Sequence, residues 1–247
     1  MGDSGLSKLA TFCVVSLVAV GLGGCTADTS DPAEADAFVF DPGNGGTPLE
    51  FAEVSEFTYP SGPYGFDVGD ILPDYAFVGY ANYAEPIVPG LQISRMSDFY
   101  NPTGQELHSE VSAYGPNKPK PLAINLVIGS GWCPPCQNEA ATILPPRYDQ
   151  YAPAGHFVSA MIDGYSTGIP ADINALDTWS MAFSPKYTML IDPKSQLMTH
   201  YYPAFPGSLI IDARTMMIMY REVGQPNDAF WTAFEGVIAG TYVIPTE

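Results

Sequence analysis

The chain is poor in positive charge. Nine Lys and Arg residues stand against 27 Asp and Glu residues in a chain of 247, which gives a formal net charge of −18. Binding to nucleic acid or to anionic lipid through charge needs a basic surface, because phosphate groups attract Lys and Arg. The composition therefore excludes both as the main function, and we expect no nucleic-acid partner.

Cysteine is also scarce, since four residues are too few for a disulfide-rich scaffold. Cys13 and Cys25 belong to an N-terminal apolar segment, which leaves Cys133 and Cys136 as the pair for chemistry. A zinc site built on C-x-x-C needs two more ligands, usually from a second close pair. No second C-x-x-C and no H-x-x-x-H occur, and the three histidines are scattered, at His108, His156 and His200. A redox pair is favoured over a metal site or inert structural cysteines, and we expect no metal or cofactor.

The surroundings of this pair favour redox chemistry. The sequence S-G-W-C-P-P-C at 130–136 follows an apolar run at 122–128 and precedes a predicted helix at 134–148. A C-x-x-C at the start of a helix after a strand is typical of a thiol–disulfide site. The positive end of the helix dipole lowers the pKa of a thiol there, which predicts Cys133 as the attacking residue. Cys136 lies three residues on, on the same face, and is predicted to resolve the mixed disulfide.

The N-terminus predicts export. Lys8 precedes an apolar run at 9–22, which is short for a membrane span and has the charged-then-apolar order of a signal peptide. The run ends in L-G-G-C at 22–25, which resembles the bacterial lipoprotein signal, where the cysteine is lipidated and becomes the first mature residue. We expect a signal peptide at 1–24 and a lipid anchor on Cys25. An ordinary signal peptide with a chance cysteine stays open, and both alternatives predict a location in the cell envelope, outside the cytoplasm, where disulfides form.

Two regions follow the signal. Residues 25–66 are rich in Asp, Glu, Gly, Pro and Ser, without Lys or Arg, and include the breaker cluster D-P-G-N-G-G at 41–46. This predicts an acidic flexible tether, although apolar triplets at 38–40 and 49–51 leave a folded extension open. Residues 67–247 are long enough for one domain. Their hydrophobic patterns predict an α/β sandwich with strands at 75–80, 91–94, 122–128, 156–162, 188–191, 208–211 and 216–220, and helices at 134–148, 171–183 and 228–239.

Four short sequences, in order, resemble the TlpA/ResA-type thioredoxin-like proteins, which are membrane-tethered thiol–disulfide oxidoreductases of bacteria. They are V-G-D-I-L-P-D-Y at 68–75, W-C-P-P-C-Q-N-E at 132–139, M-L-I-D-P at 189–193 and F-P-G-S-L-I-I-D at 205–212. The resemblance covers nearly the whole globular part. It implies a thioredoxin-like fold, in which helices flank a central mixed β-sheet that carries an N-terminal β-extension. It also implies protein disulfides or dithiols as substrates, a separate redox donor, and action as a reductant, for example in cytochrome c maturation.

The resemblance also assigns roles around the dithiol. Trp132 would shield it, Pro134 and Pro135 would tune its potential, and Glu139 would accept the proton of Cys136. Phe205-Pro206 would form a cis peptide bond that leaves backbone groups open to a substrate strand. Plain core packing of Trp132, a solvated position for Glu139 and an ordinary trans turn at Pro206 are the alternatives that stay open.

The chain departs from the family at two places. Thioredoxins carry a buried acid six residues before the first cysteine, and that position is Val127 here, so the proton of Cys136 must go to Glu139 or to water. The G-S-G sequence at 129–131 stands where the family has bulkier residues, which predicts a more open or mobile site.

Two other functions stay open. A copper-handling protein of the same fold could use Cys133, Cys136 and His200, although the copper chaperones of this fold space their cysteines C-x-x-x-C. A thiol peroxidase would need an Arg and a T-x-x-C pattern, and here Ser130 takes the position of the Thr.

Overall fold

The computed structural model describes residues 49–50, 57–198 and 204–246. The predictions for the signal peptide, for the lipid anchor on Cys25 and for His200 lie outside these ranges. Within them, no helix has the length and apolar character needed to cross a membrane.

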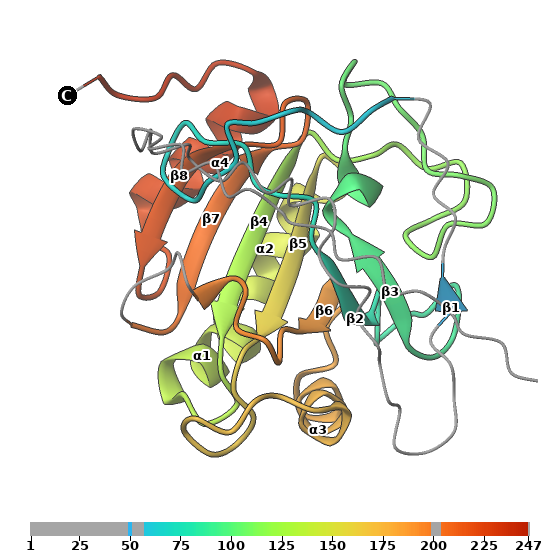
Figure 1. Ribbon diagram of the computed structural model, residues 1–247, viewed down its shortest axis with the longest axis vertical. Coiled ribbons are helices and arrows are strands. Elements are labelled where there is room, and N and C mark those ends of the chain that lie inside the picture. The colour runs from blue at the N-terminus through green and yellow to red at the C-terminus, as the bar shows by residue number, and fades with distance from the viewer. Residues whose placement is uncertain (1–48, 51–56, 199–203, 247) are drawn as a thin grey trace, which may run out of the picture. The chain divides into compact units, whose positions relative to one another are not determined.

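The core of the fold is one mixed sheet in the order β1-β3-β2-β6-β5-β4-β7-β8 (Figure 1). The central strand β4 runs parallel to β5 and antiparallel to β7, while β2 and β3 form the predicted early hairpin. The strands are β1 Leu49–Glu50, β2 Ala76–Tyr80, β3 Gln92–Arg95, β4 Ala123–Gly129, β5 Gly155–Met161, β6 Thr188–Ile191, β7 Gly207–Asp212 and β8 Met217–Val223. Each predicted strand is present, with its ends at the predicted residues or shifted by up to three residues, and the thioredoxin-like α/β fold is confirmed.

The helical elements also follow the prediction, with one difference. They are η2 Met96–Phe99, α1 Pro134–Asn138, η3 Glu139–Ile143, α2 Leu144–Tyr151, α3 Ile173–Phe183 and α4 Asp228–Ala239. The single helix predicted at 134–148 is in fact α1 and α2 joined by the π-helical turn η3. The reason is Pro145 and Pro146, which have no N–H to donate and fit only in the first turn of a helix. A new helix therefore starts at Leu144, and its N–H bonds to the carbonyl of Glu139, five residues back.

Strand alternation separates the core into two layers. On one face, Val127 and Phe157 pack under α2 and α4, and Met161 and Met189 pack under α3. On the other face, the inward residues of β4 and β5 are covered by the segment that leads into β2, by η2 and by the β7–β8 turn, through Leu72, Phe77, Met96, Phe99, Ala213 and Met216. Figure 1 shows this division, with α2 and α4 behind the sheet and the teal segment crossing in front of it.

The folded part begins earlier than the sequence indicates. Residues 57–66, which the composition assigns to the tether, run beside this front layer. The rings of Tyr59 and Phe66 pack against its core, and the hydroxyl of Tyr59 donates to the carbonyl of Leu72 at 2.7 Å. Leu49–Glu50 also pairs in parallel with β3. Acidic and helix-breaking residues outnumber the few apolar residues that pack on the core here. The average composition of the segment therefore predicts a tether and does not reveal those contacts.

Candidate functional site

Cys133 and Cys136 form a disulfide at the start of α1, with their Cα atoms 5.3 Å apart. Cys133 is the N-cap residue, and its sulfur accepts a hydrogen bond from the backbone N–H of Cys136 at 3.2 Å. The two side chains are only 2% and 4% exposed. The expected pairing and its position at a helix start are therefore present, and access to Cys133 is narrow.

Pro134 and Pro135 occupy the first two positions of α1. Neither has a backbone N–H, so two of the donors that a helix start normally presents are missing. The third position is Cys136, whose N–H reaches the Cys133 sulfur. A Cys133 thiolate would thus receive the helix dipole but a reduced set of N–H donors.

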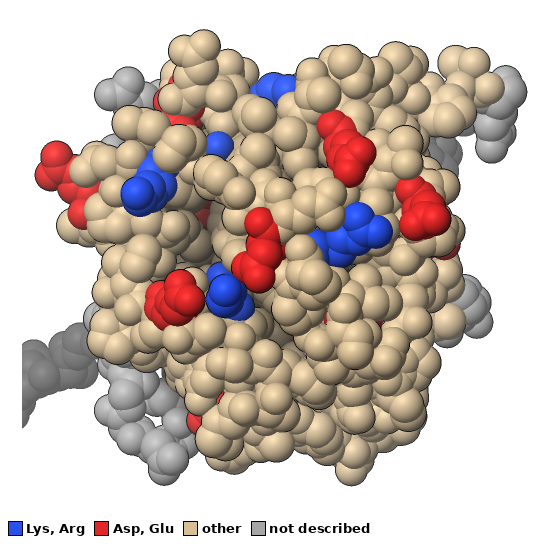
Figure 2. Space-filling view, turned by 180° about the vertical axis from the view of Figure 1, so that it is seen from behind, with Lys and Arg blue, Asp and Glu red and all other residues tan. Residues whose placement is uncertain are grey.

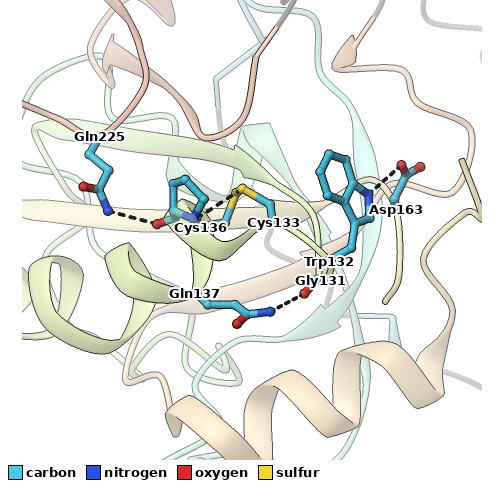
Figure 3. Close-up of a disulfide and its surroundings, with 8 residues drawn as sticks. Gly131, Trp132, Cys133, Cys136, Gln137, Asp163 and Gln225 are labelled. Carbon is cyan, nitrogen blue, oxygen red and sulfur yellow. Dashed lines mark hydrogen bonds between the residues drawn. A yellow bond between two sulfur atoms is a disulfide. The ribbon is translucent and has the colours of Figure 1, made fainter. Parts of the chain in front are cut away.

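Trp132 lies beside the dithiol and is fixed by a residue that the sequence analysis missed. Its indole N–H donates to a carboxylate oxygen of Asp163 at 3.0 Å (Figure 3). The same oxygen accepts from the backbone N–H of Gly168 at 2.9 Å. Asp163 comes two residues after the end of β5, and β4 and β5 are parallel neighbours. Because carboxyl ends of parallel strands meet at one edge, a polar residue just after β5 could have been assigned to this site.

The predicted cis-proline is present, and Phe205 packs against the apolar cluster that contains both cysteines. The Phe205–Pro206 peptide bond is cis, immediately before β7. The ring of Phe205 meets the indole of Trp132 edge to face, with centroids 6.0 Å apart. The structure therefore brings the W-C-P-P-C segment and the cis-proline segment together from positions 70 residues apart.

Glu139 is buried, so the solvated alternative is wrong. Its side chain is 1% exposed, and neither carboxylate oxygen has a hydrogen-bond partner among the described residues. Burial raises the pKa of Glu139 to about 8, because a charge in this apolar environment loses its hydration. The adjacent Tyr187 has a raised pKa as well, first through burial and then through the charge of Glu139. A carboxyl group that titrates near neutral pH can both take and return a proton there.

A small cavity joins Glu139 to the dithiol. It has a volume of about 10 Å³, enough for roughly one water molecule, and it is lined by Cys136, Glu139, Ser130 and Ser159 with apolar neighbours. Val127, at the position of the thioredoxin acid, lines it too. Glu139 therefore reaches from the helix the space into which an acid on β4 would point. The sequence signal for this position is the spacing of three residues between Cys136 and Glu139, which puts both side chains on one face of the helix.

The prediction of an open site at 129–131 is wrong. Ser130 is 1% exposed, and a Cβ on Gly131 would lie 2.9 Å from the carbonyl oxygen of Gly164. A Cβ on Gly129 would lie 3.4 Å from the Cys136 sulfur. The glycines allow close packing of the C-P-P-C turn against its neighbours.

Two glutamine side chains also hold the turn (Figure 3). Gln137 donates to the carbonyl oxygen of Gly131 at 2.7 Å, and Gln225 donates to that of Pro135 at 2.9 Å. No sequence signal could have found Gln225, because it comes from the loop after β8, 90 residues away.

In the view of Figure 2, Lys and Arg lie singly among Asp and Glu, without a continuous basic patch on that face. Within the described ranges, no three His, Cys, Asp or Glu residues gather as metal ligands. His156 is partly buried, and the loss of hydration lowers its pKa to about 3, so it stays neutral; it packs with Phe99 and Tyr148. The His200 of the copper alternative lies outside the described residues.

No protein-family model and no curated protein matches the chain. Among solved structures it is similar to a hypothetical protein from Sinorhizobium meliloti 1021, with a TM-score of 0.52 and 12% identity over 75% of this chain and 91% of that one. It is similar to an uncharacterized conserved protein from Geobacillus kaustophilus, with a TM-score of 0.51 and 14% identity over 77% and 92%. The exposed lipoprotein thioredoxin Etrx1 from Streptococcus pneumoniae gives a TM-score of 0.46 and 16% identity over 66% and 98%. At these identities the likeness shows the fold alone.

Proposed function

We propose that this protein is a lipid-anchored thiol–disulfide oxidoreductase of the bacterial cell envelope, of the TlpA/ResA type, which reduces disulfides of exported proteins. The observation that carries the proposal is the shared cavity of Cys136 and Glu139 beneath a disulfide at a helix start. It supplies a nucleophile, a resolving thiol and a proton acceptor in one place.

The arrangement supports a two-step exchange. The Cys133 thiolate attacks one sulfur of a substrate disulfide, and the other substrate sulfur leaves as a thiolate that takes a proton from solvent. The Cys136 thiol then gives its proton to Glu139 and attacks the Cys133 sulfur. The Cys133–Cys136 disulfide forms and the second substrate thiolate is released, so two electrons have passed to the substrate. A raised pKa suits Glu139 to hold that proton next to the disulfide.

The prolines of the turn favour the reducing direction. A disulfide becomes a strong oxidant when its thiolate form is highly stabilised. Pro134 and Pro135 withhold two N–H donors from the Cys133 thiolate, so the dithiol form is less stabilised. The pair should then give electrons readily to a protein disulfide. Delivery to cysteines of proteins in cytochrome c maturation is the use that the family resemblance suggests.

The test measures potential and turnover together. We expect a Cys133–Cys136 potential well below that of a strong oxidant such as DsbA, which is about −120 mV. The reduced protein should reduce insulin disulfides, whereas the Cys133→Ser variant should not. A potential near −120 mV, or a reduced parent protein that leaves insulin intact, would overturn the proposal.

A further inference from the structure

Two neighbouring residues on the loop between β8 and α4 bond to two different segments of the site. The backbone N–H of Gly224 donates to the carbonyl oxygen of Pro206 at 2.8 Å. The side-chain amide of Gln225 donates to the carbonyl oxygen of Pro135 at 2.9 Å, as Figure 3 shows. One short loop therefore connects the cis-proline segment to the C-P-P-C turn.

The position of this loop is fixed at both ends. On one side Val223 pairs with Gly207 in the β7–β8 ladder. On the other side Asn227 caps α4 with its side chain. Gly224 has a φ of +91°, in the left-handed region that favours glycine, which turns the chain toward Gln225. Only residues 224–226 lie between the two anchors, so the backbone of Gln225 has little room to move.

Backbone bonds, such as that from the Gln137 N–H to the Cys133 carbonyl at 3.1 Å, hold the C-P-P-C turn from within, and side-chain donors add to them. Its two prolines provide no backbone N–H, and reduction removes the covalent bond between Cys133 and Cys136. The side chain of Gln137 bonds within the same segment, to Gly131. The side chain of Gln225 comes instead from the loop between β8 and α4. The same loop also donates a hydrogen bond to Pro206, through the N–H of Gly224.

We propose that Gln225 is a positioning residue, which holds the C-P-P-C turn of the reduced protein at a fixed separation from Pro206. A protein disulfide that lies along Phe205-Pro206 must present its sulfur to Cys133 at the same time, so its reaction depends on that separation. A small disulfide contacts only the Cys133 sulfur, so its rate of reaction does not depend on the separation between the turn and Pro206. This inference rests on the proposed function, because it concerns reaction with protein substrates.

The experiment compares two substrates in the full chain. We expect Gln225→Ala to lower the rate constant for insulin reduction by about three- to tenfold, the range for loss of one hydrogen bond. The single-turnover rate with a small aromatic disulfide should stay within about twofold of the parent value. Gln225→Lys keeps a donor of similar length and should restore most of the insulin rate. The matched control is Gln150→Ala, which removes an exposed amide on α2 that faces Glu235 at 3.5 Å.

A second readout does not depend on a substrate. In the reduced Gln225→Ala protein, Cys136 should be alkylated several-fold faster than in the parent, because a loosened turn exposes a thiol that is now 4% exposed. Unchanged insulin reduction and alkylation, or equal loss on both disulfides, would overturn the positioning role. Failure of the parent protein to reduce insulin would instead count against the proposed function, and alkylation would still test the role of Gln225.

Discussion

Glu139 lies one helical turn beyond Cys136, and the two side chains line the same cavity of about 10 Å³. The carboxyl group has been removed from water, while the sulfur beside it must lose a proton for the disulfide to form. This relationship determines how the reaction and the stability of the fold should respond to pH.

Replacing Glu139 should change the pH dependence of the reaction. In the parent, closure of the Cys133–Cys136 disulfide should accelerate as Glu139 ionises, with a midpoint near its pKa of about 8. Glu139→Gln should lose that rise and be slower by about tenfold or more at pH 8, since a positioned base contributes at least that much. Stopped-flow oxidation of the reduced protein measures it, and an unaltered profile would remove Glu139 from the mechanism.

Glu139 should also make the stability of the fold depend on pH. In the parent, the free energy of unfolding should fall over the pH range in which the rate of disulfide closure rises. Glu139 titrates at 4.5 in the unfolded chain and at about 8 in the folded one, so between these values the folded state binds more protons. The free energy of unfolding of the parent therefore falls as pH rises from about 4.5 to about 8. Glu139→Gln should lack this decline, and denaturant melts at several pH values measure it. Glu110→Gln, at an exposed position, is the control and should follow the parent.

Pro135→Ala should make the dithiol less reducing. The alanine supplies an N–H at the second position of α1, where it can reach the Cys133 sulfur. We expect the Cys133 pKa to fall by roughly one unit and the potential to rise by about 30 mV. Thiolate absorbance and glutathione equilibration measure these values. Pro146→Ala in α2 should change neither, and a potential lowered by Pro135→Ala would contradict the argument.

Asp163→Ala should weaken the reaction with proteins and the fold together. It removes the acceptor for the Trp132 indole and for the N–H of Gly168. Loss of a charge-assisted acceptor costs about 1.5–3 kcal/mol, so the melting temperature should fall by several degrees. Asp163→Asn keeps an acceptor oxygen and should lose less. Near-UV circular dichroism reports the freed indole, and an unchanged spectrum with full activity would contradict the assigned role.

The two cysteines should differ in trapping. Cys136→Ser leaves the attacking thiol without its resolving partner, so mixed disulfides with substrates should accumulate at Cys133. Cys133→Ser should trap few, because Cys136 lies inside α1 and lacks the N-cap position that lowers the pKa of a thiol at Cys133. Non-reducing gels of envelope extracts make the comparison, and equal trapping by both variants would reverse the assignment.

Cys25→Ser should release the protein from the membrane fraction, because it removes the residue that the L-G-G-C sequence offers for lipidation. Radiolabelled palmitate incorporation is the direct measurement. A variant that fractionates like the parent would show that the anchor has been assigned wrongly.

The sequence predicted what local patterns determine. The apolar run before W-C-P-P-C, the helical spacing of Phe230, Trp231 and Phe234 and the F-P-G sequence each specify one element, and each is present. Contacts between distant segments that no motif or strand end marks were not predictable, which is why the bond from Gln225 to Pro135 was missed. The open site expected at 129–131 failed for a related reason, because glycine signals flexibility unless a neighbour such as Gly164 fills the space.

The early start of the folded part limits how far the dithiol can work from a membrane. If Cys25 carries the lipid proposed above, the chain between the anchor and the first described strand is residues 26–48, because Leu49 already pairs with β3. Those 23 residues, 26–48, extend at most about 80 Å. Partners must then meet the dithiol within that reach plus the width of the folded domain, which favours substrates that are themselves bound to the bilayer. Lengthening this stretch should widen the set of proteins reduced without altering the chemistry.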